Sequence, residues 1–251
     1  MELRLLSSLH FWLFIATFFS TTFAGANLIK QFDAKASVGL FSGLPYSLSI
    51  MLILAFHEAG HYFAARWWGM KKITPPMFIP MPFFPLGTMG AVINIKDTFP
   101  NRRVLFDVGA AGPWIGLLAT AGLWQLTGLV SSPYVLFQIN FAVTVGIIVT
   151  FINLLPLGCL DGGHIFYAVA GKKHKWFKYW VFAATLFYIF TIQKTFEPWV
   201  LLIFVVLFGL RHAPTENDDT PLDRPRQVAS WLTLLMFLGL DLFGKSLEEL
   251  F

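Results

Sequence analysis

Residues 54–68 read LAFHEAGHYFAARWW, placing two histidines and a glutamate in a run otherwise apolar enough for a membrane helix. Ionisable side chains are unfavourable in hydrocarbon, so inside a membrane they mark a functional site by default. On a helix, His57 and His61 lie one turn apart on one face, and Glu58 projects beside them. Two imidazoles placed in this way can bind a single metal ion. The stretch therefore predicts a metal site on a membrane-spanning helix.

The composition agrees with a protein that lies mostly in a bilayer. Charged residues make up 13% of the 251 residues and hydrophobic residues 56%, whereas soluble domains carry about 25% charged residues. A spanning helix needs about 20 mostly apolar residues. The apolar runs are 8–24, 46–68, 104–130, 134–170, 176–193, 198–210 and 228–243. We expect an all-α polytopic membrane protein with six or seven transmembrane helices.

Some of these runs have a second interpretation. Residues 24–26 read AGA, the small-x-small form of a signal-peptide cleavage site, so the first run could be a cleaved signal peptide. Under either interpretation the 46–68 helix runs from the outside to the cytoplasm. The runs 176–193 and 198–210 are short and could form a re-entrant pair, which would reverse the last helix.

The segment 71–103 interrupts the helical pattern. It holds six Pro and two Gly among many apolar residues, and Pro at this density prevents a helix. GTMG at 87–90 followed by AVINI is typical of a turn that leads into a strand. Irregular backbone at membrane depth is tolerated where it is buried in protein or lines a water-filled cavity. We therefore expect a re-entrant β-hairpin after the HExxH helix; the alternative is an amphipathic loop among the lipid headgroups.

The positive charges predict how the chain crosses the membrane. If Arg4 is cytoplasmic and seven spans follow, 14 of the 18 Lys and Arg residues fall on the cytoplasmic side, as the positive-inside rule requires. The metal site would then lie near the cytoplasmic side of a multi-pass protein. No Arg- and Ser-rich transit segment precedes the first run, which favours the cell (plasma) membrane over an organelle.

The third metal ligand must come from elsewhere in the chain, because a catalytic zinc site has three protein ligands and an open fourth position. The spans offer Asp107 and Asp161. Counting helical residues from the basic loops at 1.5 Å each puts His61 and Asp161 at similar depths, roughly 8–16 Å from the cytoplasmic face. Asp107 follows Arg102 and Arg103 so closely that we expect it to pair with them near the surface. Asp161 is the predicted ligand, and one Zn2+ per chain is the expected cofactor, since two His and a carboxylate suit zinc.

Beside such a zinc ion, Glu58 is placed to act as a general base. Zinc lowers the pKa of a bound water to about 7, and a neighbouring carboxylate takes the proton as the hydroxide attacks a carbonyl. Cys159 and His164 lie within three residues of Asp161 and are other potential ligands. A small buried residue and a polar residue near a helix end are their simpler interpretations.

Two motifs on separate spans together resemble the site-2 protease family. H-E-x-x-H occupies 57–61, and N-x-x-P-x-x-x-x-D-G is formed by Asn153, Pro156, Asp161 and Gly162. RRVLFDVGAAGPWIG at 102–116 and the Pro/Gly hairpin before it are also similar to that family, so the resemblance covers about residues 40–170. No soluble domain is inserted between the spans, which is similar to a minimal form of the family.

The resemblance implies a domain organisation and a catalytic centre. The family consists of intramembrane zinc metalloproteases with a three-helix catalytic core. That core would span 39–170, between an N-terminal helix with its outer loop (1–38) and C-terminal helices (171–251). Zinc would be bound by His57, His61 and Asp161, with Glu58 as general base. Asn153 would stabilise the tetrahedral intermediate as an oxyanion-hole donor.

The resemblance also implies a substrate and a way of binding it. The family cleaves transmembrane segments of other membrane proteins within the bilayer. The hairpin would offer its edge to the unwound substrate as an added strand. The residues expected to bind substrate in this way are Gly90, Ala91, Val92, Ile93 and Asn94.

Two other functions stay open on the residues alone. A membrane HExxH protease of another lineage would take its third ligand from a later Glu, but the later Glu residues lie at span ends or in loops. A non-catalytic zinc-binding chaperone or scaffold would not need Glu58. The net charge of +4 is too small and too scattered for a nucleic-acid partner. The expected partners are the lipid bilayer and a transmembrane protein substrate; the sequence does not predict the oligomeric state.

Overall fold

The computed structural model describes residues 2–158, 160–171 and 215–248, with isolated positions between 179 and 191. Most of the described chain is helical, as expected. In chain order the elements are α1 (Glu2–Phe32), the short 3-10 helix η1 (Leu40–Gly43), α2 (Leu44–Trp67), β1 (Met77–Pro80), β2 (Thr88–Val92), α3 (Arg102–Thr127), α4 (Pro133–Asn153), α5 (Asp161–Ala170) and α8 (Arg224–Glu248).

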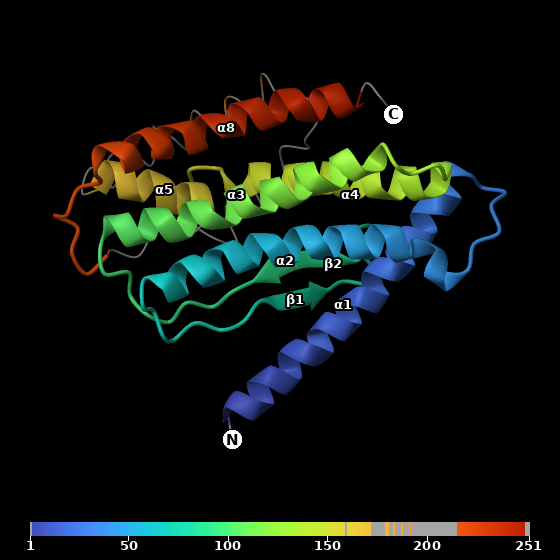
Figure 1. Ribbon diagram of the computed structural model, residues 1–251, viewed down its shortest axis with the longest axis horizontal. Coiled ribbons are helices and arrows are strands. Elements are labelled where there is room, and N and C mark those ends of the chain that lie inside the picture. The colour runs from blue at the N-terminus through green and yellow to red at the C-terminus, as the bar shows by residue number, and fades with distance from the viewer. Residues whose placement is uncertain are drawn as a thin grey trace.

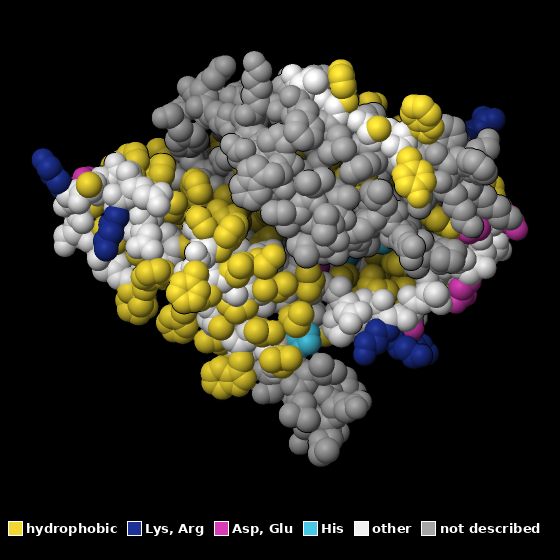
Figure 2. Space-filling model, turned by 180° about the vertical axis from the view of Figure 1, so that it is seen from behind, with side chains coloured by type: hydrophobic (Ala, Val, Ile, Leu, Met, Phe, Trp, Pro, Cys, Tyr) yellow, Lys and Arg dark blue, Asp and Glu magenta, His cyan; other side chains and the backbone are white. Residues whose placement is uncertain are grey.

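Among the described residues, four helical segments are long and apolar enough to cross a membrane. They are Leu9–Phe32, Leu40–Trp67, Arg102–Thr127 and Pro133–Asn153. On the face shown in Figure 2, most coloured side chains away from the two ends are hydrophobic, and Lys and Arg lie toward the ends. A polytopic helical membrane protein is confirmed to this extent. The predicted spans 176–193 and 198–210 fall almost entirely outside the described residues, so the total of six or seven stays a prediction.

The helices α2, α3 and α4 form the centre of a bundle, with α5 and α8 beside them and α1 crossing at an angle (Figure 1). Helices in a membrane associate through close packing, which small residues allow. A Cβ atom on Gly60 of α2 would lie only 2.5 Å from the carbonyl oxygen of Ala111 in α3. Buried side chains that include Leu105, Val143 and Ile165 join α3, α4 and α5. Both α2 and α5 therefore pack against α3.

The predicted β-hairpin is present. β1 and β2 pair antiparallel, with Phe78 opposite Ala91. β1 packs on α1 and β2 on α2. The tip of the hairpin bonds to Tyr46, in the first turn of α2, and its base follows Trp67, the last residue of that helix. The hairpin therefore extends along most of α2 (Figure 1), as a re-entrant segment requires.

The run 134–170 is not one continuous helix as the sequence suggested. α4 ends at Asn153 and α5 begins at Asp161. The break has two local causes: Pro156 has no backbone N–H, and Gly158 adopts a left-handed φ of 52° that favours glycine. The intervening turn packs against α5 so tightly that a Cβ atom on Gly162 would lie 2.0 Å from the carbonyl oxygen of Leu154. The break makes Asn153 the last residue of one helix and Asp161 the first residue of the next.

The expected pairing of Asp107 with Arg102 and Arg103 is wrong. Arg226, at the start of α8, donates to the Asp107 carboxylate through both Nε and Nη2, each at 2.8 Å. The two neighbouring arginines instead donate to carbonyl oxygens in the segment 215–223. A partner 119 positions away in the chain leaves no local signal in the sequence. These bonds tie α8 and the segment before it to one end of α3.

Replacing Arg226 tests this connection. Arg226→Ala removes a charge-assisted bidentate contact and leaves the partly buried Asp107 carboxylate without its cation. We expect the variant to lose about 1–2 kcal/mol of unfolding free energy, seen as a lower thermal midpoint of the purified protein in detergent. Arg224→Ala, an exposed position in the same turn, should change stability by less than about 0.5 kcal/mol. Equal midpoints for the two variants would contradict the role of this ion pair.

The contacts at this end of the protein should also make its stability depend on pH. The Arg226 backbone N–H donates to Asp223 at 3.0 Å, and this bond, helped by the Arg226 guanidinium, lowers the pKa of Asp223 below its usual 3.8. A carboxyl whose pKa is lowered by folding stabilises the protein above its unfolded pKa, and the stabilisation is lost as the pH falls through the folded pKa. The wild-type thermal midpoint should therefore fall below about pH 4 more steeply than that of Asp223→Asn. Parallel pH profiles would show that Asp223 makes no such contribution.

Candidate metal centre

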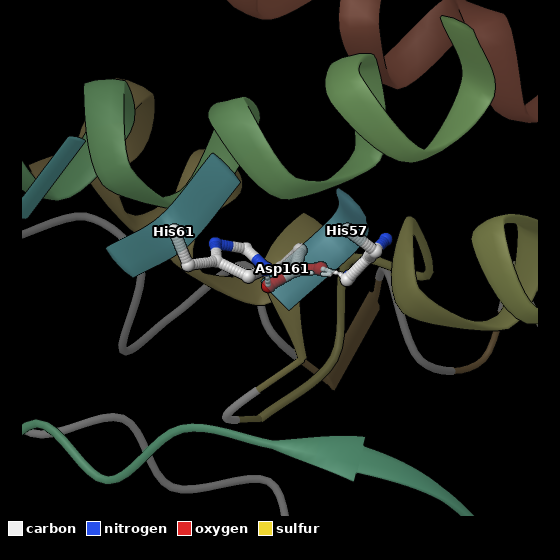
Figure 3. Close-up of side chains that lie close together, drawn as sticks. All are labelled: His57, His61 and Asp161. Atoms are coloured by element: carbon white, nitrogen blue, oxygen red, sulfur yellow. Dashed lines mark hydrogen bonds and ion pairs between the residues drawn. The ribbon is translucent and has the colours of Figure 1, made fainter. Parts of the chain in front are cut away.

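The three predicted metal ligands, from two distant parts of the chain, meet at one point (Figure 3). His57 and His61 come from α2, and Asp161 is the first residue of α5. Nε2 of His57 lies 3.2 Å from Oδ2 of Asp161, and Nε2 of His61 lies 3.2 Å from Oδ1 of the same carboxylate. The two Nε2 atoms are 3.3 Å apart. Both imidazoles are buried.

These separations fit a zinc ion. Bonds of about 2.0–2.1 Å in a tetrahedral arrangement place neighbouring donor atoms about 3.3 Å apart, close to the 3.2–3.3 Å found here. Two imidazole nitrogens and one carboxylate also form a donor set that catalytic zinc sites use, with a fourth position left for water or substrate. The residues present can therefore hold zinc.

A carbonyl group fixes the orientation of His61. Nδ1 of His61 lies 2.7 Å from the Val108 carbonyl oxygen in α3. Because a carbonyl can only accept, Nδ1 carries the proton and the lone pair is left on Nε2, which faces Asp161. Metal-binding histidines characteristically have such an outer partner, which holds the ring and its tautomer. Helix α3 thus supports the site although it supplies none of the three predicted ligands.

Glu58 is buried beside His57, and it links the site to the hairpin. Glu58 is only 7% exposed, and its carboxylate lies near the Ile93 backbone N–H. The predicted base therefore lies between the metal-binding residues and the chain that continues β2.

Asn153 also reaches the site, from the end of α4. Its Nδ2 lies 3.2 Å from Nε2 of His57. An imidazole nitrogen that binds a metal cannot also accept this hydrogen bond, because it has one lone pair. With a metal bound, the Asn153 amide is available to another acceptor beside the site.

The predicted substrate-binding residues 90–94 differ in their surroundings. Val92 and Asn94 are exposed, and the other three are partly buried. Asn94 bonds to the β1 side of the hairpin, where the Thr74 N–H donates to its carbonyl oxygen at 3.0 Å. Backbone groups alternate in direction along an extended chain, so those of Ile93 face the opposite edge, in agreement with the position of its N–H near Glu58. That edge is the side from which a further strand could pair.

Two glycines that make room for the histidines were not predicted from the sequence. A Cβ atom on Gly112 of α3 would lie 2.0 Å from Nε2 of His61, and one on Gly116 would lie 3.0 Å from Nδ1 of His57. The signal was available, because Gly109, Gly112 and Gly116 follow a spacing of three and four residues along one face of a helix. In a membrane protein this pattern indicates close helix packing; here the space is filled by imidazole rings.

Within the described part of the chain, no other potential ligand belongs to this cluster. The ring of His164 lies 6.0 Å from that of Phe99, and His164 is not among the three residues whose donor atoms converge. Cys159 lies outside the described residues. Asp107 contacts Arg226 at the end of the bundle.

Comparison with known proteins supports the relationship that the two motifs suggest. The family model for peptidase family M50 matches residues 45–137 and 129–192, which together include more than half of the chain and all the predicted ligands. The chain belongs to family M50, the site-2 protease family.

The M50 chain also resembles plant proteins described as probable zinc metalloproteases. It is 32% identical over 169 residues to EGY1, chloroplastic, of Oryza sativa subsp. japonica, which covers 52% of this chain and 29% of the rice protein. It is 27% identical over 255 aligned positions to EGY2, chloroplastic, of Arabidopsis thaliana, which covers 86% of this chain and 44% of that relative. The matched regions thus amount to less than half the length of these relatives.

The close approach at Gly112 gives a test of the metal site in this M50 protein. In Gly112→Ala the added methyl group would overlap the His61 ring, so His61 must move and zinc affinity should fall by at least 10- to 100-fold, as for disturbed metal sites generally. Zinc content after dialysis, measured by mass spectrometry of the metal, reports the loss. Gly122→Ala makes the same change in the same helix where nothing lies within 4 Å, and it should keep its zinc. Full zinc occupancy in Gly112→Ala would contradict the position of His61.

Proposed function

We propose that this protein is an intramembrane zinc endopeptidase that hydrolyses peptide bonds in or near transmembrane segments of other membrane proteins. The main support is the convergence of His57, His61 and Asp161 within 3.3 Å of one another. Two of these residues lie on a helix long and apolar enough to span a membrane, and a buried carboxylate, Glu58, lies beside them. Membership of family M50 supports the same activity.

The residues of the site have complementary roles in this proposal. The two histidines and Asp161 would hold zinc, which when bound would supply the Lewis acidity needed to activate water and polarise the peptide carbonyl. Glu58 accepts a proton from the attacking water and returns it to the departing amide nitrogen, so the enzyme ends with the protons it began with. The Asn153 amide donates to the oxygen that gains negative charge. The Val108 carbonyl holds His61 in the tautomer that binds metal.

The edge of the hairpin suits the substrate class. A peptide bond in a helix is shielded by the helix, so the substrate must unwind before water can reach the bond. An unwound segment in a low-dielectric site needs partners for its backbone N–H and C=O groups. Residues 90–94, with Ile93 turned toward Glu58, would provide them by strand addition. The substrate would then pair with the hairpin at Ile93, next to the proposed base Glu58, so the paired segment would lie at the reacting centre.

The partners and location follow from the same proposal. We propose that the protein lies in a plasma membrane as a multi-pass protein, with its site nearer the cytoplasmic side and a transmembrane protein as substrate. The distribution of Lys and Arg in the sequence is the basis for this orientation. The word chloroplastic describes the plant relatives and gives no support to a plasma membrane.

The alternatives are weaker than this proposal. A protease of another lineage disagrees with membership of family M50. A non-catalytic zinc-binding scaffold is compatible with the three ligands, but it gives Glu58 no role. A carboxylate buried near a metal site without a function is an unfavourable arrangement.

Glu58→Gln separates catalysis from metal binding. Loss of the proton acceptor should lower cleavage by about 10²- to 10⁴-fold, while zinc content stays at the wild-type level because Glu58 is not a ligand. The measurement uses a panel of single-span membrane proteins co-expressed with each variant, with truncated products detected by mass spectrometry and zinc measured on the purified protein.

Two further variants make the result specific. Glu216→Gln makes the same chemical change at an exposed position and should cleave normally, whereas Asp161→Ala should lose both zinc and cleavage. The same products from wild type and Glu58→Gln would assign the cuts to another enzyme. No cleavage by the wild type would favour the scaffold. Loss of zinc in Glu58→Gln would place Glu58 among the ligands.

A further inference from the structure

The tip of the hairpin is held by two buried hydroxyl groups from different helices. Ser20 Oγ, in α1, donates to the Gly87 carbonyl oxygen at 2.6 Å. The Tyr46 hydroxyl, in α2, donates to the Leu86 carbonyl oxygen at 2.9 Å. Tyr46 is fully buried and Ser20 is 7% exposed. Two adjacent carbonyls, the last before β2 begins at Thr88, are therefore fixed to the bundle.

Helix α1 lies directly against this point. Gly87 has a φ of 73°, and a Cβ atom on it would lie 2.6 Å from the Ser20 carbonyl oxygen and 2.7 Å from Cα of Thr21. The same part of α1 is linked to α2, because Thr21 Oγ1 and Ser47 Oγ are 2.7 Å apart. Figure 1 shows α1 passing beside the hairpin where it meets α2. The contact thus joins α1, α2 and the start of β2.

The distances along the chain relate this contact to the metal centre. Tyr46 precedes Glu58 by 12 residues on α2, which is about 18 Å along a helix. Gly87 precedes Ile93 by six residues, which is about 20 Å along an extended chain. The strand and the helix therefore run side by side over nearly equal lengths. They are bonded at the tip through Tyr46, and at the site the Ile93 N–H lies near the Glu58 carboxylate.

This arrangement sets the register of the strand. A slip of one residue moves a strand by about 3.3 Å and turns each backbone group to the other edge. After such a slip, the Ile93 N–H would no longer face Glu58, and a paired substrate would present a different peptide bond to the site. The Gly87 carbonyl oxygen also accepts from the Met81 N–H at 3.1 Å, so a slip would cost most at the hydroxyl groups. Ser20 and Tyr46 are both buried, and a slip would take these acceptors away from them.

We infer that Ser20 and Tyr46 are positioning residues that fix the register of the substrate-binding edge against Glu58. Helix α1 therefore contributes to substrate positioning by the peptidase. The inference rests on the proposed function for its meaning. It also disfavours the interpretation of the first apolar run as a cleaved signal peptide, since cleavage after Ala26 would remove Ser20.

The test uses Ser20→Ala, Tyr46→Phe and the double variant, each of which removes oxygen atoms and adds none. The matched control is Thr22→Ala, because Thr22 is also fully buried in α1 but donates within its own helix, to the Phe18 carbonyl oxygen at 2.7 Å. The probe is a single-span membrane protein that the wild type cleaves and Glu58→Gln does not. Zinc content, KM, kcat and the termini of the products are measured for each variant.

We expect the double variant to keep its zinc and to cut at two or more neighbouring peptide bonds instead of one. Its KM should rise about five- to tenfold, as for the loss of buried hydrogen bonds, with a smaller change in kcat. Thr22→Ala should keep the single cut. A single unchanged cut with unchanged KM in the double variant would overturn the inference. Loss of zinc in the single variants would also overturn it, because the hydroxyls would then support the metal site itself.

Hydrogen exchange separates this inference from the proposed function. Backbone amides of residues 88–95 should exchange faster in Ser20→Ala and Tyr46→Phe than in the wild type, while those around His57 and Glu58 stay protected. This measurement needs no substrate, so it tests the anchor even if the wild type cleaves nothing. Unchanged exchange in 88–95 would show that the two hydroxyls do not hold the strand.

Discussion

Two buried imidazoles and a carboxylate that is only 12% exposed lie within 3.3 Å of one another, an arrangement that requires a cation. A buried carboxylate is strongly destabilising unless charge and hydrogen bonds compensate it. Zinc would satisfy Asp161 and both Nε2 lone pairs at once, with the separations that tetrahedral coordination needs. Much of the surrounding structure can be understood as making that convergence possible. The glycines of α3 leave room for the rings, the Val108 carbonyl orients His61, and the break between α4 and α5 turns Asp161 toward α2.

The broken helix has a second consequence. If α4 and α5 were continuous, Asn153 and Asp161 would lie eight residues apart, or about 12 Å along the helix. The turn at 154–160 instead lets both side chains reach His57, at 3.2 Å in each case. One interruption in a hydrophobic run therefore supplies the predicted third ligand and the predicted oxyanion donor together. Irregular backbone of this kind is tolerated at membrane depth where protein covers it or where it lines a water-filled cavity, and here it packs under the first turn of α5.

The sequence predicted the residues of the site better than the long-range contacts that hold those residues in place. His57, Glu58, His61 and Asp161 could be chosen because ionisable residues are rare in apolar runs and because the HExxH spacing follows the helical period. The hairpin was predicted from the proline density of 71–103. What could not be predicted depends on contacts between distant segments: Arg226 with Asp107, Ser20 with Gly87, and Gly112 with His61. Such pairs have no periodicity or motif, because only the packed bundle brings them together. The broken helix was missed for a different reason, since Pro156 and Gly158 lie inside a long apolar run that was interpreted as a single span.

The central claim is that two histidines and a carboxylate bind one metal ion here, and X-ray absorption at the zinc K-edge tests it most directly. Zinc-loaded wild-type protein should show only nitrogen and oxygen neighbours at about 2.0–2.2 Å, with the scattering of two imidazoles. Asp161→Ala, reloaded with zinc, should lose this signal or the metal. A sulfur neighbour at about 2.3 Å would instead identify a cysteine ligand, and a third imidazole would identify His164. Either of those results would contradict the ligand set on which this account depends.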